Sequence, residues 1–194
     1  MMLIRQVPLK LVSTGQVIAA EVYGRLDMKD LRTAELSWHA YRPKSAEYSH
    51  WRWTDKISRL GSGSNELYGL WHAKECQGMM EVLMDRVSRS PATLGQPLVY
   101  INYIESAPWN QANSASALKY TGVGSILIAF AMLLSRDAGY NGVVGLHSLT
   151  AAETFYSHVI GMTDLGIDTN YDGLRYFEMS QSRSTSYLQK LGLI

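Results

Sequence analysis

The chain has 194 residues, of which 46% are hydrophobic, and this suits one ordinary domain built around a single core. Eighteen Lys and Arg against seventeen Asp and Glu give a net charge of +1, which argues against nucleic acid and anionic membranes as partners. Cys76 is the only cysteine, so an intrachain disulfide is excluded. No apolar run reaches the roughly 20 residues of a membrane span, and no signal-peptide core precedes Pro8, so we expect a cytoplasmic protein.

The first third of the chain predicts one strand followed by two helices. A short strand is expected over Leu9–Val12, and acidic residues from Asp27 onward mark the start of a helix that ends before Pro43. A second short helix is expected over Ser49–Leu60. The Gly-Ser run after it is interpreted as a loop rather than a domain boundary.

Three strands are expected next. Leu67–Ala73 and Gly78–Met84 lie on either side of a short polar turn, which favours an antiparallel hairpin. Leu98–Glu105 is the clearest strand, because it is rich in aromatic and β-branched residues. A polar loop follows over Asn110–Ala117.

The second half of the chain alternates helices and strands. A largely apolar helix is expected from about Thr121 to Ala138, followed by a strand over Gly142–His147. Thr150 and Glu153 have capping-box spacing for another helix, which Gly161 would end. Two more strands, over Met162–Leu165 and Tyr171–Met179, precede a polar tail over residues 180–194.

The junction between the clearest strand region and the apolar helix carries the strongest functional signal. Residues 119–125 read Lys-Tyr-Thr-Gly-Val-Gly-Ser, and glycines at this spacing let the backbone turn tightly and approach a ligand closely. The first N–H groups of the following helix lack intrahelical partners and suit an anion. A dinucleotide fingerprint would need glycine at Leu127, and a P-loop would need lysine at Ser125. A simple turn into a buried helix remains the alternative.

The pattern from Lys119 to Gly124 resembles the pyrophosphate loop of the GNAT N-acetyltransferase superfamily, with Lys119 in the place usually held by Arg or Gln. Two further segments are similar to family motifs. Ser106-Ala107-Pro108 matches the ending of the fourth family strand, and Ala152, Phe155, Tyr156, Gly161 and Met162 match the helix after the fifth. Four departures stand out: Leu149 replaces the usual Asn, one extra residue precedes Gly161, Met162 replaces the usual Phe, and ten residues separate Pro108 from Lys119.

The resemblance implies an α+β fold. The expected architecture is a GNAT-type α/β/α sandwich around a largely antiparallel, splayed central sheet of about seven strands. It implies a single domain over residues 1–194, with its core over about 9–179.

The resemblance also implies acetyl-CoA as co-substrate. The pyrophosphate would be held by backbone N–H groups of the loop, and the pantetheine would lie against the fourth strand. The cofactor-binding residues expected on this basis are Ser106, Lys119, Tyr120, Thr121, Gly122, Val123, Gly124 and Ser125. No metal site is expected, because the histidines show no ligand spacing with Cys76.

Three residues are candidates for the chemistry of acyl transfer, which needs a base for the amine and an acid for the thiolate. Glu105 ends a strand and is the candidate base, with a salt bridge as the alternative. Tyr156 matches the family tyrosine and is the candidate acid, with a core aromatic role as the alternative. His147 is a second candidate base, with a structural role as the alternative.

The acceptor is the least predictable feature. Aromatic residues between Trp38 and Trp53 lie where family members form a wall of the acceptor pocket, and Met28–Leu60 has a local excess of three cations. These aromatics either stack on a planar amine or pack two helices onto a sheet. We therefore expect transfer of an acetyl group to a small-molecule or peptide amine. A toxin-like acetyltransferase acting on tRNA and a non-catalytic CoA-binding module are the alternatives, and formation of a homodimer is left open.

Overall fold

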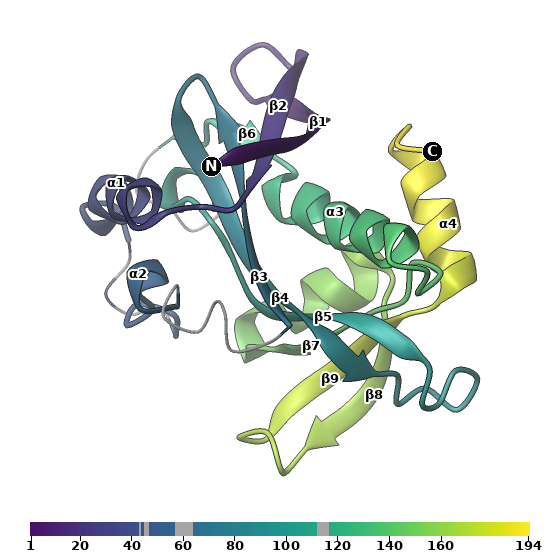
Figure 1. Cartoon of the computed structure of the whole chain (residues 1–194). Helices are drawn as coiled ribbons and strands as arrows, with labels where there is room; N and C mark the ends of the chain where they lie inside the picture. Colours follow the sequence, from purple (N-terminus) through teal and green to yellow (C-terminus); the bar gives the residue numbers. More distant parts are fainter. Residues whose placement is uncertain (43, 45–46, 57–63, 112–116) are drawn as a thin grey trace. The chain divides into compact units, whose positions relative to one another are not determined.

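The computed structural model describes residues 1–42, 44, 47–56, 64–111 and 117–194 (Figure 1). The chain forms two compact units, Met1–Glu81 with Tyr103–Leu127 and Val82–Asn102 with Ile128–Ile194. Three elements run from one unit into the other: β4 (Glu75–Val87), β5 (Pro97–Ser106) and α3 (Val123–Asp137).

The sheet has more strands than the sequence patterns predicted. In the first unit the hydrogen-bonded order is β6-β1-β2-β3-β4-β5, and in the second it is β4-β5-β7-β9-β8. The described residues thus form nine strands instead of about seven. The pairing is largely antiparallel, as expected, with β5 and β7 as the parallel pair.

The chain begins with a hairpin of β1 (Met2–Leu11) and β2 (Val17–Gly24), where only a strand over Leu9–Val12 was expected. Most of β1 is exposed, with Val7 and Leu9 as its buried side chains. Two apolar positions give too short an alternation for the whole strand to be recognised from the sequence.

Helix α1 (Met28–His39) begins with a capping box that the acidic residues before it supply. The Asp30 N–H donates to the Asp27 carboxylate at 2.9 Å, and the Asp27 N–H donates to the Asp30 carboxylate at 3.1 Å. The helix ends before Pro43, as predicted. Of the helix expected over Ser49–Leu60, the structure has α2 (Trp53–Lys56), and residues 57–63 lie outside the described part of the chain.

The expected hairpin is formed by β3 (Asn65–His72) and β4, with Ala73 and Lys74 both at positive φ in its turn. In Figure 1 helices α1 and α2 lie beside the strands of the first unit. Their buried side chains join one hydrophobic cluster with the strands, which contains Leu31, Ala34, Trp38, Trp53, Leu67, Trp71, Cys76 and Met79. This cluster is part of the core of the first unit.

The second unit confirms the predicted strand, helix, strand crossover, because β7 (Val144–Ser148) pairs in parallel with β5. The chain then returns through β8 (Thr163–Asp168) and β9 (Leu174–Met179), which pair antiparallel with one another. Strand β9 also pairs with β7, so it lies between β7 and β8.

The segment after β7 differs from the capping box predicted at Thr150 and Glu153. A short turn, η3 (Thr150–Ala152), has Leu149 at its N-cap with no side-chain cap, and the π-helical segment η4 (Phe155–Ile160) follows. The predicted stop is confirmed, since Gly161 has φ +80° in the left-handed region.

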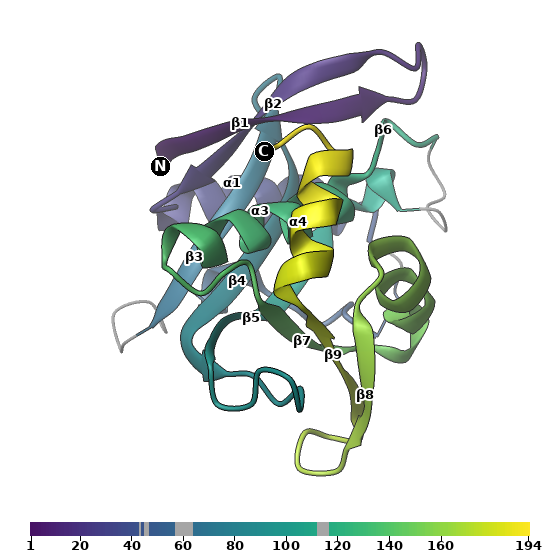
Figure 2. The same ribbon diagram turned by 90° about the vertical axis from the view of Figure 1, so that its right-hand side faces the viewer.

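Within the polar tail expected over residues 180–194, Gln181–Lys190 forms helix α4, which the sequence did not predict (Figure 2). Only Ser184 and Leu188 are buried on it, a stripe too short to recognise among so many serines. Arg136 near the end of α3 donates to Thr185, which ties α4 to α3 within the second unit. Among the helices that the structure describes, none is both long and apolar enough to cross a membrane.

Candidate functional site

The glycine loop lies in the first unit, between β6 (Tyr120–Thr121) and α3. Gly122 has φ +83° and open space where a Cβ would be, so glycine is favoured here by conformation rather than by crowding. The Ile126 N–H donates to the Gly122 carbonyl at 2.9 Å, which closes the first turn of α3. The preceding N–H groups of residues 123–125 therefore have no intrahelical acceptor, which makes them the candidate anion site.

Strand β6, which the sequence did not predict, fixes the start of this loop. Tyr120 pairs with Leu11 and Thr121 with Lys10 on β1, and the Val12 N–H donates to the Lys119 carbonyl at 3.0 Å. The start of the loop at Lys119 is thus held by the first strand of the chain.

Lys119 has a protein partner. Its Nζ lies 3.0 Å from Oε2 of Glu75 and 4.8 Å from the ring centre of Trp109. Both charged side chains are about half exposed, at 47% and 50%. An exposed pair of this kind is weak and can exchange partners at little cost, so Lys119 remains available to an anion.

Gly78 on β4 lets the first turn of α3 approach the sheet. A Cβ at this position would lie 2.8 Å from Val123, 2.9 Å from Leu127 and 3.2 Å from the Glu105 carbonyl oxygen. The missing side chain therefore brings the anion site and the end of β5 together within the first unit. This close approach could not be recognised from a single glycine in a strand.

Glu105 is buried, with 4% of the residue exposed, and its carboxylate is held by two side chains. Arg42 donates from Nε to Oε1 at 3.0 Å and from Nη2 to Oε2 at 2.9 Å. The indole of Trp53 donates to Oε2 at 2.7 Å. The structure therefore contains the salt bridge that the sequence offered as the alternative for Glu105.

The electrostatics of Glu105 are a balance of opposing effects. Burial raises the pKa of Glu105 above its ordinary value, and the Arg42 charge and the Trp53 hydrogen bond oppose that rise. A carboxylate has about four acceptor positions, and the three donated bonds leave room for one further donor such as a water. Arg42 and Trp53 were not predicted as partners of Glu105.

Tyr156 lies in the second unit, on η4, and is 6% exposed. Its ring lies against Phe155 and Phe177, with centroid distances of 5.3 and 5.9 Å. Burial raises the pKa of the Tyr156 phenol, so the group keeps its proton at neutral pH. A proton donor needs this state, although the packing is equally that of a core aromatic.

His147 is also in the second unit, and both of its ring nitrogens are engaged. Nδ1 lies 2.7 Å from the Tyr100 hydroxyl and Nε2 lies 3.0 Å from Oδ2 of Asp168. The imidazole stacks on Tyr171, with ring centres 3.9 Å apart and planes 10° apart. Its side chain is 2% exposed, so a substrate would reach it only through a neighbour such as Tyr100.

Charge around His147 is set by Asp168 and Arg89, two residues that the sequence did not point to. Hydrogen bonds from Arg89 and His147 lower the pKa of Asp168 to about 2. Burial lowers the pKa of His147, with the Arg89 charge acting in the same direction and Asp168 opposing it. The ring is therefore neutral, with Nε2 as donor to the carboxylate and Nδ1 as acceptor from Tyr100.

Ser106, the last residue of β5, contributes its backbone to local structure, because its carbonyl accepts a bond from Gln111 Nε2 at 2.7 Å. Beyond it, η2 (Pro108–Asn110) is fastened to β4 through Gln77, which accepts from Trp109 and Asn110 at 3.0 and 2.9 Å. Part of the long loop expected before Lys119, residues 112–116, lies outside the described residues.

Two of the three tryptophans in the aromatic segment pack in the core and offer no stacking surface, since Trp38 and Trp53 are fully buried. Lys56 lies 2.9 Å from the ring centre of Tyr103 and is itself 5% exposed. Cys76 and Met79 are core residues of the strands, as expected. No group of three metal-ligating side chains occurs in the described part of the chain.

No family model matches this sequence, and no curated protein does either. Solved structures do resemble the fold. The KacTA complex with DNA aligns over 88% of this chain and 99% of its own, with a TM-score of 0.60 and 12% identity. A protein from Desulfovibrio desulfuricans assigned to the GNAT acetyltransferase family covers 84% and 99%, with a TM-score of 0.53 and 15% identity.

A third similar structure is a mutant AtaT toxin bound to acetyl-CoA and to the C-terminus of the antitoxin AtaR. It aligns over 89% of this chain and 98% of its own, with a TM-score of 0.52 and 12% identity. Identities this low establish the fold alone. The chain has the α+β fold of the GNAT acetyltransferases, as the sequence motifs implied.

Proposed function

We propose that this protein, which has the GNAT fold, transfers an acetyl group from acetyl-CoA to an amine by direct attack. The observation that carries the proposal is the glycine loop at Gly122, whose helix start offers unpaired N–H groups. Acetyl-CoA is present in the similar AtaT structure, which supports the choice of co-substrate. The residues fit a pyrophosphate, because Gly122 leaves open space and Lys119 supplies a cation beside it.

In this proposal the residues of the loop bind and the buried side chains handle protons. The co-substrate supplies a thioester carbonyl, which the amine nitrogen attacks as the carbon to sulfur bond breaks. Tyr156 donates its phenolic proton to the departing thiolate, and a base takes the proton that the amine loses. Burial keeps Tyr156 protonated until the thiolate forms, while the raised pKa also makes its phenol a weaker proton donor.

Glu105 remains our proposed base, acting through a water at its free acceptor position. Its ion pair with Arg42 competes with that role, since a paired carboxylate binds a proton less readily. His147 is the second candidate, and it would accept the proton through the Tyr100 hydroxyl. Glu105→Gln and His147→Gln separate the two, because only the variant that lacks the true base should lose the acidic limb of the kcat pH profile.

The test of the proposed function has two parts. Calorimetry measures binding of CoA, and a panel of primary amines is assayed by release of the CoA thiol. We expect Tyr156→Phe to bind CoA normally while kcat falls at least about 100-fold. Tyr140→Phe is the matched control, because its hydroxyl donates to the Met84 carbonyl within the second unit and should leave kcat unchanged.

Three results would contradict the proposal in different ways. Absence of CoA binding would remove the co-substrate. Binding without turnover on any amine would favour a CoA-binding module without catalysis. An unchanged kcat in Tyr156→Phe would remove the acid role and leave the fold and the loop untouched.

A tRNA acceptor is the second candidate function, since toxin structures are among the similar folds. Arg42 is not expected to contact phosphate, because its charge is already paired with Glu105. The exposed cations Lys44 and Arg52 would then carry the contacts. Salt-dependent retention of tRNA that disappears in a Lys44→Glu, Arg52→Glu variant would establish this acceptor, and retention by neither protein would remove it.

A further inference from the structure

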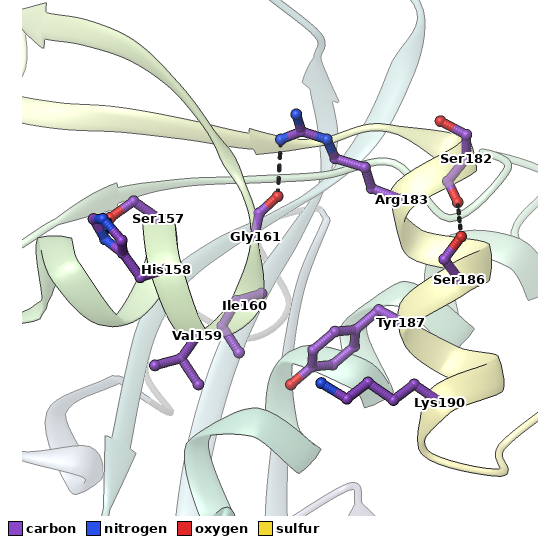
Figure 3. A pocket seen from close by; sticks show the side chains of 10 residues that line it. All are labelled: Ser157, His158, Val159, Ile160, Gly161, Ser182, Arg183, Ser186, Tyr187 and Lys190. Atoms are coloured by element: carbon purple, nitrogen blue, oxygen red, sulfur yellow. Dashed lines mark hydrogen bonds between the residues drawn. The ribbon is translucent and has the colours of Figure 1, made fainter.

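A groove of about 580 Å³ lies between η4 and α4, within the second unit (Figure 3). One wall is the end of η4, from Ser157 to Gly161, and the other is α4. The proposed acyl transfer uses Tyr156 from η4, but neither it nor any other proposed catalytic residue lines this groove. The groove therefore calls for an explanation of its own.

Helix α4 presents one continuous face to the groove. Arg183, Tyr187 and Lys190 are separated by four and three residues, the spacing that places side chains in a row on a helix. Figure 3 shows all three side chains on the side of α4 that faces η4. Ser182 and Ser186 add hydroxyl groups along the same wall.

The groove is cationic and lacks a compensating carboxylate. No Asp or Glu is among its lining residues. Within the described part of the chain, neither Arg183 nor Lys190 forms an ion pair, whereas the nearby Arg175 pairs with Glu153 and Asp164. Two uncompensated cations on one face of a cavity favour an anionic ligand.

Arg183 is held in place by the end of η4. Its Nη1 donates to the Gly161 carbonyl at 2.9 Å and to the Thr163 hydroxyl at 3.1 Å. These contacts fix the guanidinium at one end of the groove, and among the described residues no acceptor is found for its Nε and Nη2. A guanidinium positioned in this way offers the fork that binds phosphate through two parallel hydrogen bonds.

We propose that this groove binds the phosphate monoester of a nucleotide. A phosphate monoester carries a charge of about −2 at neutral pH, which the two cations match. The half-buried ring of Tyr187 and the exposed Val159, 58% accessible, give an apolar surface against which a planar base packs. A volume of about 580 Å³ lies within the range of small-molecule sites.

The phosphate has two chemical sources. It is either the 3′-phosphate of CoA, an assignment that rests on the proposed function, or part of a separate nucleotide. CoA and 3′-dephospho-CoA differ only in this phosphate. Adenosine 3′,5′-bisphosphate carries it without the pantetheine arm.

The experiment measures binding of adenosine 3′,5′-bisphosphate by calorimetry in phosphate-free buffer. We expect Lys190→Gln to weaken binding by about tenfold and Arg183→Lys, which keeps the charge but loses the fork, to weaken it as well. Lys29→Gln, an exposed lysine on α1, is the matched control and should bind as wild type. Absence of binding, or equal effects of the Lys29 and Lys190 variants, overturns the proposal.

Binding measurements with CoA and 3′-dephospho-CoA then identify the source of the phosphate. If the wild type binds CoA more tightly than 3′-dephospho-CoA and Lys190→Gln removes that difference, the phosphate belongs to CoA. If Lys190→Gln binds CoA as wild type does and loses only the bisphosphate, the ligand is a separate nucleotide. Bisphosphate binding in a protein that binds no CoA leaves the groove assigned and removes the proposed acetyl transfer instead.

Discussion

Arg42 and Glu105 stand 63 residues apart in the chain, yet the guanidinium contacts both oxygens of the carboxylate, at 3.0 and 2.9 Å. Their side chains are 10% and 2% exposed, so the pair is largely shielded from water. It joins the segment after α1 to the end of β5 within the first unit.

Removing Arg42 should therefore be costly. In Arg42→Ala the Glu105 carboxylate loses its cation while staying buried, and we expect a loss of about 3 to 5 kcal/mol in the free energy of unfolding. Urea denaturation measures it. Adding Glu105→Gln to Arg42→Ala should recover part of the loss, because a neutral amide needs no cation. A double variant no more stable than Arg42→Ala would show that lost packing, not charge, is responsible.

The neutral state of His147 predicts sensitivity to acid. Burial lowers the pKa of His147, so the folded protein disfavours the charged ring. Above about pH 6.5 the ring is neutral in both the folded and unfolded states and adds no pH dependence. Below that pH the unfolded chain takes up the proton first, and stability falls. Urea denaturation from about pH 7.5 to 5.5 should show a steeper decline in wild type than in His147→Gln; parallel declines would contradict this.

Gly78→Ala should disturb the candidate anion site by pushing the first turn of α3 away from β4. Its Cβ would lie under 3 Å from Val123 and Leu127, and we expect a loss of about 1 to 3 kcal/mol together with weaker CoA binding. Adding Val123→Ala makes room for the new methyl group and should restore part of both. Additive losses in the double variant would mean that Gly78 is not contacted in this way.

The capping box of α1 gives a test confined to one helix. Asp27→Ala leaves the Asp30 N–H without its acceptor and should lower the midpoint of thermal unfolding. Asp27→Asn keeps an acceptor oxygen and should remain close to wild type. Asp85→Ala, which changes an exposed carboxylate on β4, is the control for loss of charge alone.

Elements with a local signature were predictable from the sequence. The strand expected over Leu98–Glu105 became β5, and the apolar run after the glycine loop became α3, because each carries its periodicity over many residues. Helix α4 was missed since its burial depends on two positions, Ser184 and Leu188. The box predicted at Thr150 failed because the chain there forms a short turn whose N-cap residue, Leu149, has no side-chain acceptor.

In the candidate site too, local features could be predicted from the sequence and long-range contacts could not. The loop geometry at Gly122 followed from the sequence, because positive φ and glycine are linked locally. The partners of Glu105 and His147 did not, since Arg42 and Asp168 reach them from segments 63 and 21 residues away. No spacing rule connects such pairs before the chain is folded.

The pairing of β6 with β1 couples the ligand loop to the start of the chain. Two ladder positions and the bond from Val12 to the Lys119 carbonyl join the two segments, so local opening of the first strand should release the loop. A ligand bound at Gly122 should thus slow amide hydrogen exchange in Lys10 and Leu11, which it does not touch. Amide hydrogen exchange in the N-terminal strand would therefore report whether a ligand occupies the loop.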